Sequence, residues 1–211
     1  MNKHSSFVLP GLLLAVALLL ASCGGSGESE HGMHESKGEM AGMDMGSGET
    51  APPELIIDGE YSDERFVDMM SAHHQMAIDM AEVAQEEAEL PEIRRIADDI
   101  IASQQSEIDE FESIKGEEFG SSEVPARMNP EEPSMFGMMM PDELAGQEPF
   151  DRAFIDSMIP HHASAIEMAS IANMRSDSPE IKRITRSITD AQSREIGQMN
   201  ELRRQNYPGY G

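Results

Sequence analysis

Apolar residues recur at helical spacing along much of the chain. Ile93, Ile96 and Ile100 follow one another at intervals of three and four residues, and an equivalent set begins at Ile181. This spacing places apolar side chains on one face of an α-helix. Alternating apolar and polar runs and Asn-Gly turns, which are typical of strands and hairpins, are absent from the sequence. The pattern therefore predicts an all-α fold without strands.

Capping residues and prolines predict where the helices begin. Ser62 and Ser178 suit N-caps, and Pro91 and Pro179 stand at the first helical position, where a missing N–H is tolerated. The second helix is expected to stop near Gly116, since glycine often follows the end of a helix. Four helices are expected, over residues 62–90, 91–116, 150–174 and 178–205.

The four helices are expected to form two hairpins joined by one long connection. Each hairpin has a tight turn, and residues 116–149 link the two hairpins. This order is typical of a ferritin-like four-helix bundle with a long crossover. We therefore expect one bundle domain over residues 60–206, made of two repeats at 62–115 and 150–205.

The two hairpins are internal duplicates. Residues 66–81 align without a gap to the residues 88 positions later, and the alignment superposes two histidine doublets, His73-His74 and His161-His162. Each doublet has methionine nearby. A duplication that keeps paired histidine with methionine indicates soft-metal coordination, with copper as the first candidate.

The chain begins with a predicted lipoprotein signal peptide. Residues 1–22 carry a basic start and a short apolar run, and the segment ends in Leu20-Ala21-Ser22-Cys23. This ending resembles a bacterial lipobox, in which cleavage precedes a lipidated cysteine. We therefore expect a lipid anchor at Cys23 and a location in the cell envelope, facing the periplasm or the outside.

Residues 23–59 are predicted to form a flexible tether. Glycine, serine and glutamate dominate this segment, so it has little to bury. A solubilising linker with incidental methionine is one interpretation, and a second site of metal capture is the other. The residues that favour metal capture are His31, Met33, His34, Met40, Met43 and Met45.

The composition limits the partners. Forty acidic and 15 basic side chains give a formal net charge of −25, which argues against binding nucleic acid. A negative surface attracts cations, although it also serves solubility alone. Cys23 is the only cysteine, so a soft-metal site in the folded domain must use methionine and histidine.

Neighbouring methionines are the expected partners of the histidines. Met70 lies three and four residues before His73 and His74, and Met158 stands in the same relation to the second doublet. Residues at these intervals share a helix face, and a thioether beside an imidazole suits Cu(I). The two histidines of one doublet point about 100° apart, so the remaining ligands must come from another helix or from the other repeat.

Reflecting each hairpin about its turn places polar residues opposite the doublets. The reflection places Gln104 opposite His73 and His74 and Glu107 opposite Met70. In the second hairpin it places Gln192 opposite His161 and His162 and Glu195 near Met158. All four occupy core positions of isoleucine-rich helices, where an unpaired amide or carboxylate costs a few kcal/mol. We expect them to hydrogen-bond or orient the imidazole rings.

The doublet motif resembles that of the bacterial domain-of-unknown-function family 305. The pattern Phe-x-x-x-Met-x-x-His-His-x-x-Ala-x-x-Met-Ala occurs in both repeats, and the resemblance covers residues 60–205. It implies a ferritin-like bundle, and copper as the bound metal, because some members are secreted or periplasmic copper-binding proteins. The ligands that it implies are Met70, His73, His74, Met80, Met158, His161, His162 and Met168.

Other functions of such a bundle fit these residues less well. A di-iron centre needs Glu-x-x-His pairs, whereas Met70 and Ser71 stand three residues before the first doublet. The sequence has no Gly-x-Ser-x-Gly motif, and a lipidated Cys23 would leave no free thiol, so no enzymatic activity is expected. A non-metal envelope interaction or stress-response module, in which the histidines are structural, stays open as the alternative.

The sequence therefore predicts a lipid-anchored, extracytoplasmic protein that binds copper, with Cu(I) favoured, and sequesters or delivers it. Its expected partners are metal ions and the membrane. A second copy of the chain or a copper-handling protein is a further expected partner.

Overall fold

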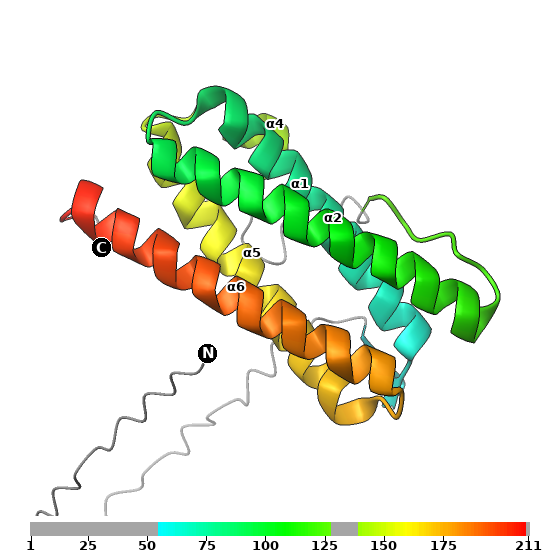
Figure 1. Ribbon diagram of the computed structural model, residues 1–211. Coiled ribbons are helices and arrows are strands. Elements are labelled where there is room, and N and C mark those ends of the chain that lie inside the picture. Colours follow the sequence, from blue (N-terminus) through cyan, green and yellow to red (C-terminus); the bar gives the residue numbers. More distant parts are fainter. Residues whose placement is uncertain (1–54, 128–138, 210–211) are drawn as a thin grey trace, which may run out of the picture. The chain divides into compact units, whose positions relative to one another are not determined.

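The computed structural model describes residues 55–127 and 139–209, all within one compact unit, Ser47–Gly211. This unit is almost entirely helical, which confirms the predicted all-α bundle (Figure 1). Its long helices are α1 (Asp63–Glu87), α2 (Pro91–Phe119), α5 (Phe150–Arg175) and α6 (Pro179–Asn206). The crossover carries one short helix, α4 (Pro141–Leu144), whose Leu144 is fully buried.

The helices pair as two hairpins that pack against each other. Helix α1 packs along α2, and α5 packs along α6 (Figure 1). The hairpins meet where α1 contacts α5, and α2 also contacts α6. The contact between α1 and α5 is the more extensive of the two, so we call these helices the inner pair, and the two histidine doublets lie on them.

The predicted caps are present at the starts of α1 and α6. The hydroxyl of Ser62 accepts a hydrogen bond from the backbone N–H of Arg65, and Ser178 does the same for Ile181, each over 3.3 Å. Each bond satisfies one of the N–H groups that a helix start leaves without a partner.

The predicted end of α2 near Gly116 was wrong. Helix α2 continues through Gly116 and ends before Gly120, which adopts the left-handed conformation with a φ of 80°. Glycine takes this conformation without the steric penalty of a Cβ atom, so Gly120 terminates the helix.

A small hairpin precedes α1, contrary to the expectation of no strands. Strand β1 (Ile56–Ile57) pairs antiparallel with β2 (Glu60–Tyr61). Asp58 and Gly59 form the turn with positive φ values of 54° and 83°. Asp-Gly is as strong a hairpin signal as Asn-Gly, so the sequence does carry a signal for this turn. Leu55 is fully buried, so the domain begins before the predicted tether boundary at residue 59.

The core consists of two apolar clusters. The first joins the end of α1 to the starts of α2 and α5, and includes Met80, Ile93 and Met158. The second joins the start of α1 to the end of α5 and the start of α6, and includes Met70 and Met168. In the order of α1 and of α5, each histidine doublet lies between the residues of the two clusters.

None of the described helices is long and apolar enough to cross a membrane. The predicted signal peptide, Cys23 and the His/Met tract of the tether lie outside the described residues.

Candidate metal centre

Four histidines lie buried on the two inner helices. His73 and His74 of α1, and His161 and His162 of α5, have no exposed surface. Apolar residues of the core clusters stand before and after each doublet on its helix. Because this helix face is buried, the imidazoles lie in the interior of the bundle. Buried imidazole nitrogens need polar partners or a bound ligand.

The imidazoles form a row across the bundle. The ring centroids of His73 and His161 lie 3.8 Å apart, with an angle of 42° between the ring planes. His74 follows at 6.4 Å from His73, and His162 follows at 6.0 Å from His161. His73 and His161 are therefore the central pair of this group of four imidazoles, and we call the group the histidine row.

A carboxylate from an outer helix holds each end of the histidine row. The Nε2 atom of His74 donates to Oε2 of Glu107 over 2.8 Å, and Nε2 of His162 donates to Oε2 of Glu195 over 2.5 Å. Both glutamates are 8 % exposed. The hydrogen bonds expected of these two acids are thus present, one in each repeat.

A serine and a backbone carbonyl hold the two central rings. Ser164 Oγ donates to the carbonyl oxygen of His161 over 2.7 Å, so it accepts from Nε2 of His73 over 2.8 Å. Nε2 of His161 donates to the carbonyl oxygen of His73 over 3.1 Å. Sequence reasoning missed Ser164, because its counterpart in the first repeat is Met76 and the duplication gave no signal there.

These hydrogen bonds fix which ring nitrogen can bind a metal. Nε2 donates in all four rings, so Nδ1 of a neutral ring carries the lone pair. In His74, His161 and His162 the Nδ1 atom is buried and has no hydrogen-bond partner among the described residues. A metal-binding imidazole usually has its other nitrogen tied to a carboxylate or a carbonyl, as these rings have.

Burial keeps the central pair neutral. Desolvation holds the pKa of His73 and of His161 well below the ordinary value of 6.5, and neighbouring histidines lower both further. For His161 the hydrogen bond to the carbonyl of His73 acts weakly in the opposite direction. A neutral imidazole is the form that coordinates metals.

The expectation for the two glutamines was wrong. Gln104 and Gln192 are 1 % exposed, yet neither the oxygen nor the nitrogen of either amide has a hydrogen-bond partner among the described residues. Side chains lean toward the N-terminus of their own helix, so His74 tilts away from the turn and Glu107 tilts toward it. His74 therefore meets Glu107. It does not meet Gln104, which lies one helical turn closer to the loop between α1 and α2.

The expected methionine ligands are all buried. Met70, Met80 and Met158 have no exposed surface, and Met168 is 1 % exposed. Met70 and Met168 belong to the second apolar cluster, and Met80 and Met158 belong to the first. Thioethers are thus present in both clusters, before and after each doublet along α1 and α5.

Oxygen and imidazole donors alone do not complete a metal site. Within residues 55–127 and 139–209, no group of three or more His, Cys, Asp or Glu side chains is arranged to hold an ion. A metal at the histidine row therefore needs other donors, and the buried candidates are thioethers on α1 and α5 and amide oxygens on α2 and α6.

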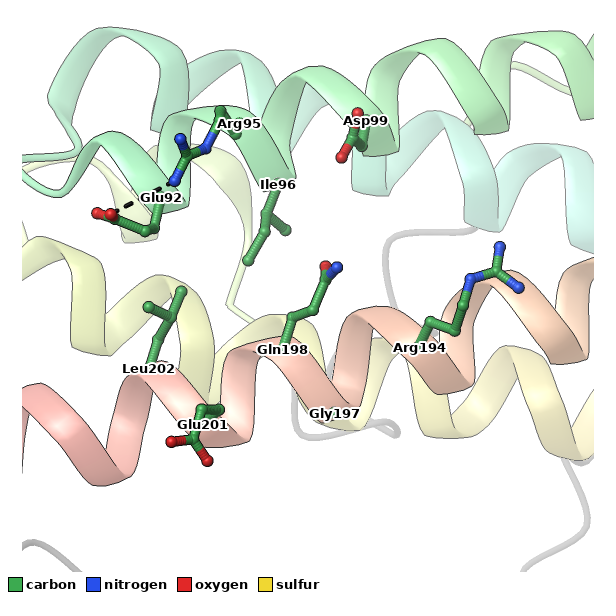
Figure 2. A pocket seen from close by; sticks show the side chains of 9 residues that line it. All are labelled: Glu92, Arg95, Ile96, Asp99, Arg194, Gly197, Gln198, Glu201 and Leu202. Carbon is green, nitrogen blue, oxygen red and sulfur yellow. Dashed lines mark ion pairs between the residues drawn. The ribbon is translucent and has the colours of Figure 1, made fainter.

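An open groove lies between α2 and α6. Its cavity volume is about 670 Å³, and Figure 2 shows the charged and polar side chains along it, with Glu92 paired to Arg95 at 3.4 Å. An adjoining cavity of about 410 Å³ shares Asp99 with the groove and extends to Glu195. Glu195 therefore separates this outer cavity from the ring of His162.

Comparison with known families gives one match over most of the domain. The family described as "Domain of unknown function (DUF305)" matches residues 63–203. A comparison with curated proteins finds no match.

Two solved proteins are similar in structure and sequence. CopM in its Cu(II)-bound form is 39 % identical with a TM-score of 0.65, and in its Cu(I)-bound form 38 % identical with a TM-score of 0.62; in both, the similarity covers 70 % of this chain and 99 % of CopM. CopM has also been solved with silver bound. A DUF305 fragment from Deinococcus radiodurans is 29 % identical with a TM-score of 0.59, covering 66 % of this chain and 93 % of the fragment.

Proposed function

The chain belongs to the DUF305 family, and from this membership and the geometry of the histidine row we propose that it binds copper outside the cytoplasm. One observation carries the proposal. Four buried imidazoles have Nε2 engaged by protein acceptors, so that Nδ1 is the nitrogen that each neutral ring offers to a metal.

Copper is the metal that the available donors favour. The buried donors that follow and precede the doublets on α1 and α5 include the thioethers of Met70, Met80, Met158 and Met168, and thioethers suit Cu(I). CopM, which resembles the whole domain, binds Cu(I), Cu(II) and silver, and this likeness supports copper for the present chain. In this proposal Cu(I) is the preferred form.

The proposed role is sequestration or delivery at the cell envelope. The lipobox at Cys23 supports a lipid anchor, and the tether supplies histidine and methionine for a first capture of ions. The acidic surface raises the local concentration of cations around the domain. The protein is a carrier in this proposal and has no catalytic role.

Competitive Cu(I) titration tests the proposal. The soluble chain from Gly24 onward is compared with a chain from Ala51 onward, which lacks the His/Met tract. A third protein replaces all four histidines of the row with glutamine, and circular dichroism checks that it is helical. We expect tight binding that survives removal of the tract and is lost with the histidines.

A structural role for the histidines is the competing function. It is favoured by the fact that each Nε2 atom already has a protein acceptor, and that no group of three or more His, Cys, Asp or Glu side chains among the described residues is arranged to hold an ion. Binding that follows only the His/Met tract, or no binding at all, would assign the row to stability and the bundle to protein interactions. Substitution of Met70 and Met158 by leucine separates the two roles further, because it removes thioethers and preserves apolar volume.

A further inference from the structure

Two buried amides in the bundle lack any described partner. Gln104 of α2 and Gln192 of α6 are each 1 % exposed, and both polar atoms of each side chain are unbonded within the described residues. The two positions are 88 residues apart and are therefore equivalent in the two repeats. A buried amide without hydrogen bonds is destabilising by roughly 1–3 kcal/mol, so its presence in both repeats points to a polar ligand.

The amides lie beside the histidine row. Gln104 stands three residues before Glu107, so the two share the face of α2 that turns toward α1, where Glu107 bonds His74. The antiparallel pairing of His74 with Glu107, continued by one helical turn, brings Gln104 opposite Ala77. Ala77 is fully buried and small, and it follows His73 and His74 by one turn.

The second repeat has the same arrangement. Gln192 stands three residues before Glu195, whose carboxylate bonds His162. The same continuation brings Gln192 opposite Ala165, which is also fully buried. Each end of the histidine row therefore has an imidazole held by a carboxylate and an amide one turn away from that carboxylate.

We propose that Gln104 and Gln192 are ligands for Cu(II), each through its amide oxygen. In this proposal the imidazoles of the histidine row bind both Cu(I) and Cu(II), and the amides bind Cu(II). The proposal rests on the proposed copper-binding function and extends it. The thioethers of Met70 and Met158 then serve Cu(I), so that one protein holds copper in either oxidation state with different donors.

The chemistry of the two ions supports this division. Cu(II) prefers nitrogen and oxygen donors in tetragonal geometry, and a glutamine oxygen is a known weak axial ligand of copper. Cu(I) prefers soft sulfur donors. Oxygen and sulfur donors are both buried on the helices around the row, whereas the imidazoles and carboxylates of the described residues are not arranged to hold an ion by themselves.

The test compares Cu(II) with Ag(I), which stands in for Cu(I) without redox chemistry. The wild-type protein is titrated with each ion beside a variant with Gln104→Leu and Gln192→Leu, and a variant with Met70→Leu and Met158→Leu. We expect the glutamine variant to lose about tenfold or more in Cu(II) affinity, the usual scale for loss of a metal-site partner, and to keep its Ag(I) affinity. The methionine variant is expected to show the reverse.

Controls make a structural effect recognisable. Gln105→Leu with Gln198→Leu alters exposed glutamines on the same two helices and is expected to change neither affinity. Gln104→Glu with Gln192→Glu keeps an oxygen donor at each site and is expected to preserve Cu(II) binding and to alter the Cu(II) electron paramagnetic resonance spectrum. Thermal unfolding confirms that every variant is folded at the temperature of titration.

Two results would overturn the assignment. Equal Cu(II) affinities in the wild-type and glutamine-to-leucine proteins would remove the amides from the site, and parallel losses for Cu(II) and Ag(I) would make them general supports of the fold. Ag(I) binding without any Cu(II) binding would also reject it and would leave the proposed function intact. Failure of the wild type to bind either ion would reject the proposed function itself.

Discussion

The imidazole of His73 donates to Ser164, and Ser164 donates to the carbonyl oxygen of His161, while the ring of His161 donates back to the carbonyl oxygen of His73. This reciprocal pair of links joins α1 to α5 at the centre of the bundle. With the ring centroids 3.8 Å apart, the two repeats share one buried polar centre. A metal bound to either ring therefore affects the contact between the repeats.

Lowering the pH below about 6.5 is expected to destabilise the apo protein. The folded protein keeps His73 and His161 neutral because burial lowers the pKa of both, whereas the unfolded chain takes up protons with an ordinary pKa of 6.5. The unfolded state then binds more protons, so stability falls as the pH drops from 6.5 toward the folded pKa values. Two such groups give a slope of up to about 2.7 kcal/mol per pH unit.

Urea unfolding of the metal-free protein between pH 7.5 and 5 measures this slope. His161→Gln is the matched variant, since it removes one of the two groups and is expected to reduce the slope by about 1.4 kcal/mol per pH unit. A slope that is the same in both proteins would mean that other groups cause the acid sensitivity.

Ser164→Ala is expected to destabilise the apo protein by about 1–3 kcal/mol. The substitution leaves Nε2 of His73 without its acceptor and removes the donor to the carbonyl of His161, both in the buried centre. Ser187→Ala, on the exposed side of α6, is the control and is expected to change stability by less than about 0.5 kcal/mol. Chemical unfolding at neutral pH distinguishes the two variants, and equal stabilities would contradict a structural role for Ser164.

Much of the helical layout could be predicted from residues that act locally. Ser62 and Ser178 cap helices because their hydroxyls bond backbone N–H groups three residues away, and that interaction depends on adjacent sequence alone. The hydrogen bonds from imidazoles to Glu107 and Glu195 could also be predicted, because a tight turn leaves little freedom in how the two helices of a hairpin pair.

The remainder depends on how the two hairpins pack and how side chains tilt. The contact between His73 and His161 joins residues 88 positions apart, and the spacing within one repeat does not determine it. Gln104 was placed one turn wrongly, because simple reflection ignores the lean of side chains toward the start of each helix. Ser164 stands where the first repeat has Met76, so the duplication gave no sign of its role.

Glu107→Gln is expected to weaken metal binding with little loss of stability. The amide oxygen of glutamine still accepts from Nε2 of His74, but it lacks the charge that makes the bound imidazole a stronger ligand. Substitution of such partners usually costs about 10–100-fold in metal affinity. Ag(I) titration measures the change, and Glu110→Gln, which alters an α2 acid paired with Arg183 of α6, serves as control. Unchanged affinity would limit Glu107 to a structural role.

Asp151→Ala is expected to destabilise the fold by about 1–2 kcal/mol without affecting metal affinity. Asp151 of α5 is 3 % exposed, and its carboxylate accepts from the backbone N–H groups of Glu89 and Leu90 over 3.0 and 2.8 Å. It thus caps the start of α2, where Leu90 offers no capping side chain. Urea unfolding beside Asp190→Ala, an exposed acid of α6, measures the effect, and equal stabilities would contradict it.

Gln104→Leu is expected to stabilise the metal-free protein by about 1–3 kcal/mol. Leucine has a similar volume and removes a buried amide whose oxygen and nitrogen have no partner among the described residues, so the desolvation penalty of that amide disappears. Gln105→Leu, next to it on the exposed side of α2, is expected to change stability by less than about 0.5 kcal/mol. Thermal and urea unfolding in the presence of a chelator make the comparison. A destabilised Gln104→Leu protein would show that the amide makes a stabilising interaction in the metal-free state. The buried amide would then no longer indicate a bound ligand.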